Sequence, residues 1–249
     1  MSGHSKWASI KHKKAIVDTR RGQQFTKLAR AITVSAREGG GDPDSNAALG
    51  NAVQKARDVS MPKENIERAI AKGTGIGADA DAIESIAYEA YGPGGVALYI
   101  EALTDNRNRT GAEVRHALAK HGGSLGTPGS VAYLFELRGV AVVDGARYSE
   151  EDLLAAVDAG AQDIVVDDDV FEVIVDPSGL PGVRAALEQA GVSVDSAEVI
   201  QRPTTRIEID EDQARRLFRL IETLEDNDDV HAVHANFEVG ADVLERMTS

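Results

Sequence analysis

The residues best suited to chemistry in this chain are the cations gathered in its first thirty-seven positions. Nine lysines and arginines there face a single acid, Asp18, which gives this segment a charge of +8. Because the whole chain carries a net charge of −14, the residues after Arg37 together carry −22. Lysine and arginine neutralise phosphates and release counterions, which gives affinity for nucleic acid without base identity. The pattern predicts a basic N-terminal arm that binds polyanions and an acidic body that avoids them.

The candidate nucleic-acid-binding residues of this arm are side chains that could contact a phosphate or an unpaired base. They are Lys6, Trp7, Lys11, His12, Lys13, Lys14, Arg20, Arg21, Lys27 and Arg30. An aromatic ring among cations suits stacking on a base, worth ~1–3 kcal/mol. Trp7 is equally well explained as a hydrophobic anchor that packs on the first helix. The alternative for the whole segment is a solvated run of charge.

Arg107 and Arg109 form a second candidate site, in the sequence TDNRNRTG at positions 104–111. We expect this segment to join a strand to a helix, and we expect Thr110 and Glu113 to form a capping box at the N-terminus of that helix. Free backbone N–H groups and the helix dipole favour an anion there, and the arginines add donors. The alternative is a capped turn whose arginines pair with nearby acids. The loop at 123–130, GSLGTPGS, is expected to be flexible and able to close over the same place.

Motifs for catalysis or metal binding are not found. The absence of cysteine removes thiolate nucleophiles and cysteine-based zinc sites. The sequence has neither a phosphate-binding GxxxxGK[ST] motif nor the metalloprotease motif HExxH. His231 and His234 lie three apart in a predicted strand and are expected on opposite faces. The acidic run at 167–169 is expected to be a hairpin turn. We therefore expect no catalytic residue, metal or cofactor. The alternative is an enzyme in which a cluster of aspartates forms a nuclease-like site.

Length and composition favour a globular protein of two or three domains. The chain has 249 residues, of which 42% are hydrophobic and 27% charged. No apolar run approaches the ~18 residues of a membrane span, and the N-terminus lacks the apolar core of a secretory signal. We therefore expect a cytoplasmic protein without a membrane partner.

The N-terminal part reads as a small helical domain. Phe25, Leu28, Ile32 and Ala36 recur at helical spacing, and glycines at 39–41 end that helix. Further helices are predicted at 46–59 and 63–72. In the second of these, cations such as Arg68 lie outside the apolar stripe. Residues 1–75 hold fourteen cations and seven acids, so they carry +7 while the remainder carries −21.

After residue 75 the hydrophobic period changes to that of strands. Strands are predicted at 83–91, 96–104 and 131–136, with a helix at 111–121. The next segment alternates as β-α-β-β-α-β, the ferredoxin-like order: strands 140–143, 164–166, 171–175 and 196–200, helices 150–159 and 181–190. The tail adds a strand at 206–209, a helix at 211–224 and a strand at 230–238.

The segment before the ferredoxin-like unit and the tail after it are each too small to fold alone. We therefore predict that they join into one discontinuous domain. The expected fold class is α+β with three domains, an N-terminal helical domain followed by two α+β domains, one ferredoxin-like and inserted in the other. The expected boundaries are 1–75, 78–137 plus 204–249, and 138–203.

Several longer motifs closely resemble the signatures of the YebC/PmpR family. They are SGHSKWASIKHKK at 2–14, MPKENIERAI at 61–70, YEAYGPGG at 88–95, TDNRNRT at 104–110 and GTPGS at 126–130. The resemblance covers essentially the whole chain. It implies an N-terminal helical domain, two α+β domains and a non-catalytic regulator. Because the first motif begins at Ser2, which leaves no room for a mitochondrial presequence, the chain resembles the bacterial, cytoplasmic branch.

Two functions remain open. Family members include bacterial DNA-binding transcriptional regulators, and the helices at 46–59 and 63–72 could mimic a helix-turn-helix. The acids Asp58, Glu64 and Glu67 make these helices a poor surface for DNA recognition. The sequence also shows no pattern that predicts a dimer interface. Others resemble ribosome-associated factors that assist translation of difficult stretches such as consecutive prolines. A basic arm with one tryptophan suits a crevice in structured RNA, including ribosomal RNA.

Overall fold

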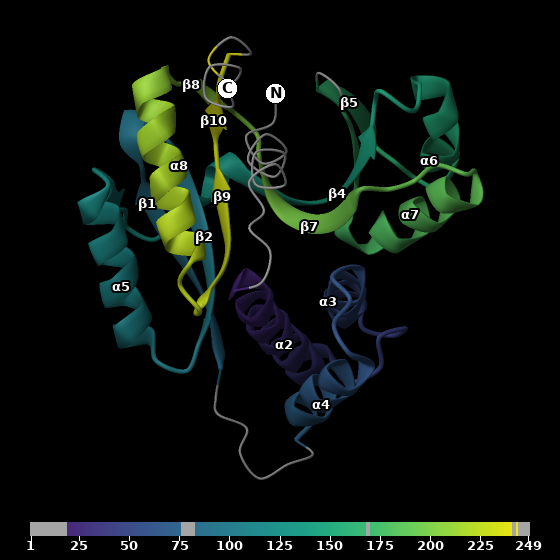
Figure 1. Cartoon of the computed structure of the whole chain (residues 1–249), viewed down its shortest axis with the longest axis horizontal. Helices are drawn as coiled ribbons and strands as arrows, with labels where there is room; N and C mark the ends of the chain where they lie inside the picture. Colours follow the sequence, from purple (N-terminus) through teal and green to yellow (C-terminus); the bar gives the residue numbers. More distant parts are fainter. Residues whose placement is uncertain (1–18, 76–82, 168–169, 241–242, 244–249) are drawn as a thin grey trace.

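Three helices pack together in the N-terminal part of the described chain. The computed structural model describes residues 19–75, 83–167, 170–240 and 243 (Figure 1). Helix α2 (Thr19–Gly39) packs against both α3 (Ala47–Asp58) and α4 (Lys63–Gly73). Their shared core includes Leu28, Ile32, Leu49, Val53 and Ile66. The three predicted helices are confirmed, and α2 begins earlier than expected.

Local sequence explains where these helices begin and how closely they approach. The Asn46 side chain accepts a hydrogen bond of 3.1 Å from the Leu49 N–H and so caps α3. Gly73 lies against α2, where a Cβ atom would collide with the Thr33 carbonyl oxygen. The Thr33 hydroxyl lies 3.1 Å from the carbonyl oxygen of Ala69. The close packing of α2 on α4 therefore requires glycine at position 73.

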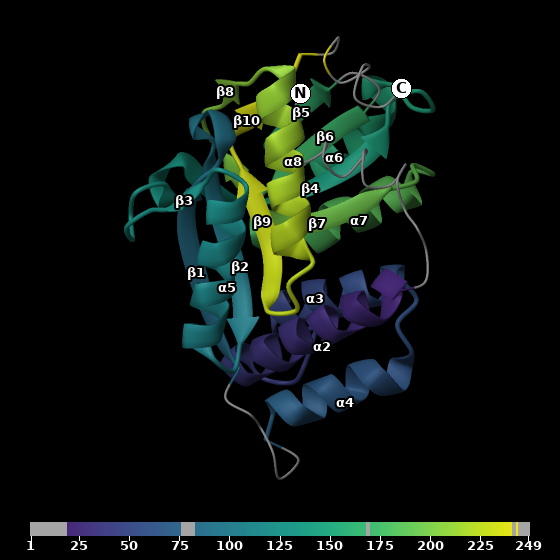
Figure 2. The same ribbon diagram turned by 60° about the vertical axis from the view of Figure 1, so that its left-hand side comes forward.

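The first sheet combines strands from distant parts of the chain, in the order β3-β1-β2-β9. Its strands are β1 (Glu84–Tyr91), β2 (Ala97–Thr104), β3 (Ser124–Leu125) and β9 (Val230–Ala235). All neighbours are antiparallel. Helices α5 (Arg107–Lys120) and α8 (Glu211–Glu225) cover one face, over a large apolar core (Figure 2). A short parallel pair is formed by β8 (Ile207–Glu208) and β10 (Phe237–Glu238).

The second sheet has the ferredoxin-like strand order β5-β6-β4-β7 and is antiparallel throughout. Its strands are β4 (Phe135–Asp144), β5 (Asp163–Asp167), β6 (Val170–Val175) and β7 (Ser196–Pro203). Helices α6 (Leu154–Asp158) and α7 (Leu180–Gln189) pack on it. The predicted fold class, α+β with a helical N-terminal part, is confirmed. The residue boundaries of the three domains stay a prediction.

Three predicted elements are wrong in their form. The strands expected at 131–136 and 140–143 are a 3₁₀ turn (Ala132–Leu134) followed by the single strand β4. Gly139 lies inside β4, at a point where a Cβ atom would lie only 3.0 Å from side-chain atoms of Leu180 and Val175. The helix expected at 150–159 opens with a 3₁₀ turn (Glu150–Leu153) before α6.

Ion pairs join the helical part to the ferredoxin-like unit. Arg184 of α7 donates two hydrogen bonds, of 2.8 and 3.0 Å, to the Asp58 carboxylate at the end of α3. One turn earlier on α3, the Lys55 ammonium lies 2.9 Å from the Glu198 carboxylate of β7. Figure 1 shows α2, α3 and α4 together at one end of the two α+β units. A two-point contact of this kind fixes the orientation of α3.

Candidate nucleic-acid interface

The predicted arm lies mostly outside the described residues. Lys6, Trp7, Lys11, His12, Lys13 and Lys14 belong to positions 1–18, which the structure does not describe. Arg20 and Arg21 lie in the first turn of α2. In the sequence the arm therefore leads directly into α2, which shares the N-terminal core with α3 and α4.

Lys27 and Arg30 use their charged groups to hold α2 on the first sheet. The Lys27 ammonium donates to the Glu225 carbonyl oxygen at the end of α8. One turn on, the Arg30 guanidinium donates to the Asp229 carboxylate at 2.6 Å and to the Asp228 carbonyl oxygen at 2.9 Å. These two predicted nucleic-acid contacts are therefore occupied by the protein's own acceptors.

The carboxylate of Asp229 gathers donors from three parts of the chain. Arg30 binds one oxygen, while Arg109 and the Thr110 hydroxyl each lie 2.7 Å from the other, and the Thr104 hydroxyl lies 3.1 Å away. The Asp229 side chain is 5% exposed. Burial by itself raises the pKa of Asp229, but these hydrogen bonds outweigh it and lower the pKa to about 2. We call these five residues the Asp229 cluster.

The Asp229 cluster changes the interpretation of segment 104–111. Helix α5 begins at Arg107, and the Asn106 side chain caps it by accepting from the Arg109 N–H at 3.1 Å. The capping box expected from Thr110 and Glu113 is therefore wrong. Asn106 supplies a cap four residues earlier, and the buried Asp229 engages the Thr110 hydroxyl.

The two arginines of this segment differ in exposure and in partners. Arg109 lies 2.7 Å from Asp229 and 2.8 Å from Asp105, and these acids raise its pKa. Arg107 has a side chain 64% exposed and lies 3.6 Å from the Glu84 carboxylate. Arg107 is thus the more available of the two for an external anion.

The loop expected at 123–130 contains the short strand β3, and its remainder at 126–130 is anchored at the other end of the first sheet. The Glu89 carboxylate accepts hydrogen bonds from the N–H groups of Gly129, Val131 and Ala132. This remainder follows β3, which pairs with β1 beside Tyr91, whereas segment 104–111 follows the strand end that pairs with Glu84. The expectation that the loop closes over that segment is wrong, because the eight-residue strand β1 separates them.

A β-bulge places two histidines on the same face of the first sheet. In the β2–β9 pair, Glu101 pairs with Ala232, but the following residue pairs with Val230, which leaves His231 as the extra residue. His231 and His234 both act on Glu101 and lower its pKa, against the effect of burial. The expectation of opposite faces is therefore wrong.

The surroundings of His231 differ from those of an exposed histidine. Burial and the neighbouring Lys55 ammonium lower the pKa of His231 to about 4.

Within the described residues, no three histidine, aspartate or glutamate side chains are grouped to hold a metal ion. The same part of the chain contains no helix with the length and apolar character to cross a membrane.

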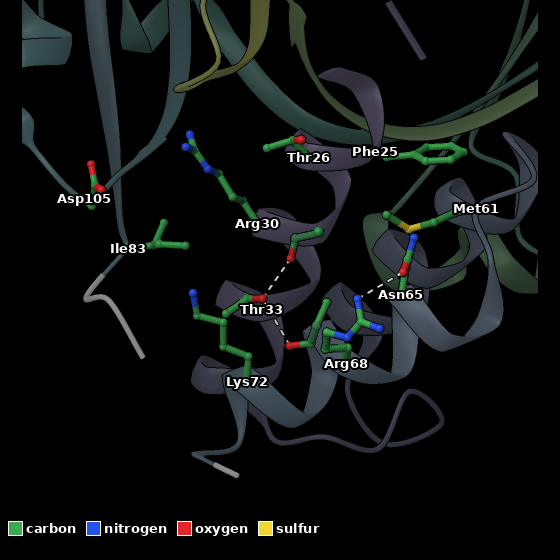
Figure 3. Close-up of a pocket in the computed structure, with 12 residues that line it drawn as sticks. Phe25, Thr26, Arg30, Thr33, Met61, Asn65, Arg68, Lys72, Ile83 and Asp105 are labelled. Atoms are coloured by element: carbon green, nitrogen blue, oxygen red, sulfur yellow. Dashed lines mark hydrogen bonds between the residues drawn. The ribbon is translucent and has the colours of Figure 1, made fainter. Parts of the chain in front are cut away.

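A cavity of about 460 Å³ lies between α2, α4 and the start of the first sheet. Figure 3 shows its lining, with Phe25 and Met61 toward one end and Ile83 and Asp105 toward the other. The remaining lining residues are Thr26, Ala29, Arg30, Thr33, Asn65, Arg68, Ala69 and Lys72. We call this the α2–α4 cavity.

Cations and apolar side chains share the α2–α4 cavity. Asn65, Arg68 and Lys72 recur at spacings of three and four, so they lie along one face of α4. Arg68 is exposed, and its guanidinium lies 3.4 Å from the Asn65 side-chain oxygen. Sequence reasoning noted these cations off the apolar stripe but did not join them to Phe25, which lies on another helix.

Comparisons with known proteins match this chain along nearly its whole length. Residues 5–76 match the TACO1/YebC protein N-terminal domain, and residues 83–237 match the TACO1/YebC second and third domain. A relative from Rubrobacter xylanophilus, named "Probable transcriptional regulatory protein", is 52% identical over 98% of both chains. One from Acidothermus cellulolyticus with the same name is 54% identical over 98% of this chain and 99% of its own.

A solved structure supports the same relationship. The crystal structure of a conserved hypothetical protein from Aquifex aeolicus superposes with a TM-score of 0.79 at 44% identity. The match covers 90% of this chain and 92% of that one. Fold and sequence therefore agree across both the helical part and the two sheets.

Proposed function

This chain belongs to the TACO1/YebC family, and from that premise we propose that it is a non-enzymatic, nucleic-acid-binding regulator of gene expression. Its close relatives carry the name of transcriptional regulators. In this proposal the basic arm and the start of α2 contact the sugar-phosphate backbone, and the acidic remainder holds the arm in place in the cytoplasm. DNA is the target that the relatives' name suggests.

The observation that carries the proposal is the separation of charge along the chain. The first thirty-seven residues carry +8 and the rest carries −22. An acidic surface repels a polyanion, so the nucleic acid is directed toward the basic segment and away from the two sheets. The contacts of Lys27 and Arg30 with the α8–β9 connection support a role for α2 as the anchor of this arm.

An RNA target on the ribosome is the second candidate, and the surface of α3 and α4 favours it. Glu64 and Glu67 are exposed on α4, and Asp58 at the end of α3 is bound by Arg184. A recognition helix that enters a major groove would bring these acids close to phosphates. A basic arm without a recognition helix instead suits structured or single-stranded RNA.

Replacement of Lys11, Lys13 and Lys14 by glutamate tests the proposal. We expect the triple variant to lose at least tenfold in affinity for both DNA and RNA at moderate salt, because three phosphate contacts become repulsive. Fluorescence anisotropy with labelled oligonucleotides measures the loss. Binding that survives the triple change would refute the role of the arm.

Crosslinking in cells then distinguishes the two targets. Sequencing of the nucleic acid attached to the intact protein is expected to return promoter DNA for a transcriptional regulator. Ribosomal RNA would instead identify a translation factor that assists difficult stretches such as consecutive prolines. The triple glutamate variant, expressed at the same level, serves as the matched control and should return neither.

A further inference from the structure

We propose that the α2–α4 cavity holds one unpaired nucleotide of a strand whose neighbouring phosphates are bound by the basic arm. This inference rests on the proposed nucleic-acid binding and adds the form of the ligand, which is a single-stranded or locally opened segment. A base inside a duplex is paired and stacked, so it would have to leave the helix to enter the cavity.

The apolar side of the cavity suits the face of a base. Phe25 is half-buried, Met61 is buried, and both lie at the same end of the cavity in Figure 3. A base that stacks on an aromatic side chain contributes ~1–3 kcal/mol, and each of the four bases can do so. The cavity volume of about 460 Å³ lies within the range of ~300–1,000 Å³ that is usual for small-ligand sites.

The polar rim suits a phosphate and the edge of a base. Arg68 forms no ion pair with any residue in the described ranges, and its exposed guanidinium is available to a phosphate. Asn65, half-buried one turn earlier, brings an amide that can both donate and accept. Lys72 adds positive charge one turn further along α4.

The cavity lies close to the point where the basic arm joins α2. Phe25 lies six residues after Thr19, the first residue of α2, which corresponds to about 9 Å along the helix. A strand bound at the end of the arm next to Thr19 can therefore reach Phe25. The basic lining of α4 and the basic arm then attract the same strand, while the acidic surfaces of the remainder direct it away from the two sheets.

Two variants and two probes test the inference in the full-length protein. The probes are a twelve-nucleotide single strand of uridines and a twelve-base-pair DNA duplex. Phe25→Leu removes the aromatic ring but keeps an apolar side chain, and Arg68→Glu reverses one charge of the rim. Arg216→Glu is the matched control, because Arg216 on α8 is 64% exposed and far along the chain from the cavity. Anisotropy measures affinity, and thermal unfolding confirms that each variant is folded.

We expect Phe25→Leu and Arg68→Glu each to weaken single-strand binding about tenfold, while duplex binding changes less than twofold. Arg216→Glu should affect neither probe. If the cavity variants weaken both probes equally, or neither, the nucleotide site is refuted. If the arm variant with glutamate at positions 11, 13 and 14 retains full affinity, the proposed function itself fails.

Photocrosslinking gives a second measurement that does not depend on folding of the variants. The wild-type protein is irradiated with a single strand that carries 4-thiouridine and is then digested with trypsin. The inference predicts crosslinks in the tryptic peptides 22–27 and 64–68, which contain Phe25 and Asn65. Crosslinks confined to residues 1–21 would show that the arm binds the strand and the cavity does not.

Discussion

Arginines from two regions of this molecule make opposite use of the same side chain. In the Asp229 cluster, Arg30 and Arg109 are bound to a carboxylate that is 5% exposed. At the α2–α4 cavity, Arg68 is exposed and its guanidinium is 3.4 Å from a neutral amide oxygen. A positive charge is therefore a sign of external binding only when the fold has not already supplied it with an acid.

The Asp229 cluster and the α2–α4 cavity also differ in the parts of the fold that they connect. The Asp229 cluster joins α2 to the first sheet and to the start of α5. It therefore fixes the position of α2, to which the arm is attached, relative to the first sheet. The cavity is lined mainly by two helices that already pack closely at Gly73. Substitutions in the first region should change stability, and those in the second should change binding.

The largest expected effect is that of Asp229→Asn. The change leaves two guanidinium groups without their shared anion, and loss of one partner from a buried ion pair costs about 3 kcal/mol or more. Urea unfolding at pH 7 should show this loss in the free energy of unfolding. Asp212→Asn, at a 70% exposed partner of Arg216, is the control and should cost less than about 0.5 kcal/mol. A loss below 1 kcal/mol for Asp229→Asn would remove the distinction between the two regions.

We expect a loss of stability in mild acid from the half-buried His231. Its pKa is about 4 in the fold and 6.5 when unfolded, so the unfolded chain binds the proton first as the pH falls. The free energy of unfolding should fall by about 2 kcal/mol between pH 6.5 and pH 5 and continue to fall toward pH 4.

Two variants isolate the contribution of His231. His231→Gln should reduce the slope of stability against pH over this range, whereas His116→Gln, on an exposed face of α5, should retain it. The pKa of His121 is also lowered, by burial and by Lys120, so some slope remains in the variant. An unchanged slope in His231→Gln would place that imidazole in contact with water.

The third prediction compares neighbouring arginines of segment 104–111. Arg109→Ala removes a donor from Asp229 and should lower the midpoint of thermal unfolding, although less than Asp229→Asn does. Arg107→Ala, at an exposed position, should leave the midpoint unchanged within 1 °C and act only on binding. Differential scanning calorimetry of both variants measures the contrast. Equal midpoints would show that Arg109 contributes nothing to the cluster.

The smallest expected effect is on stability at the cavity rim. Arg68→Ala should change the free energy of unfolding by less than about 0.5 kcal/mol, because the side chain is exposed. Chemical unfolding at pH 7 checks this value. A larger loss would mean that Arg68, like Arg30, is part of the fold rather than available for a ligand.

Sequence reasoning succeeded where local signals determine the structure. The helices expected at 46–59 and 63–72 begin within one residue of the predicted positions, where Asn46 and Pro62 are the cap residues of α3 and α4. The ferredoxin-like order and the sheet that joins β2 to β9 follow from strand spacing and from the small size of the separate pieces. Signals of this kind depend on neighbours within a few positions.

Sequence reasoning failed where a distant residue decides the local structure. The Thr110 hydroxyl does not cap α5, because it is bound by Asp229, which lies 119 positions away. The face of His231 depends on a bulge that appears only when β9 pairs with β2. Phe25 and Arg68 meet in one cavity because α2 packs on α4, which helical periodicity alone does not show. Within the candidate interface, composition predicted the cations but not which of them the fold would occupy.

The salt dependence of binding shows whether the leading basic segment is the element that binds nucleic acid. The account predicts that affinity of the intact chain for a single strand falls with a log–log slope of about −3.5, as five released phosphate contacts require. A chain that begins at Thr19, and so keeps α2, should lose most of that slope together with most of its affinity. If the shortened chain binds DNA and RNA as tightly and as steeply as the intact chain, the leading basic segment is not the binding element.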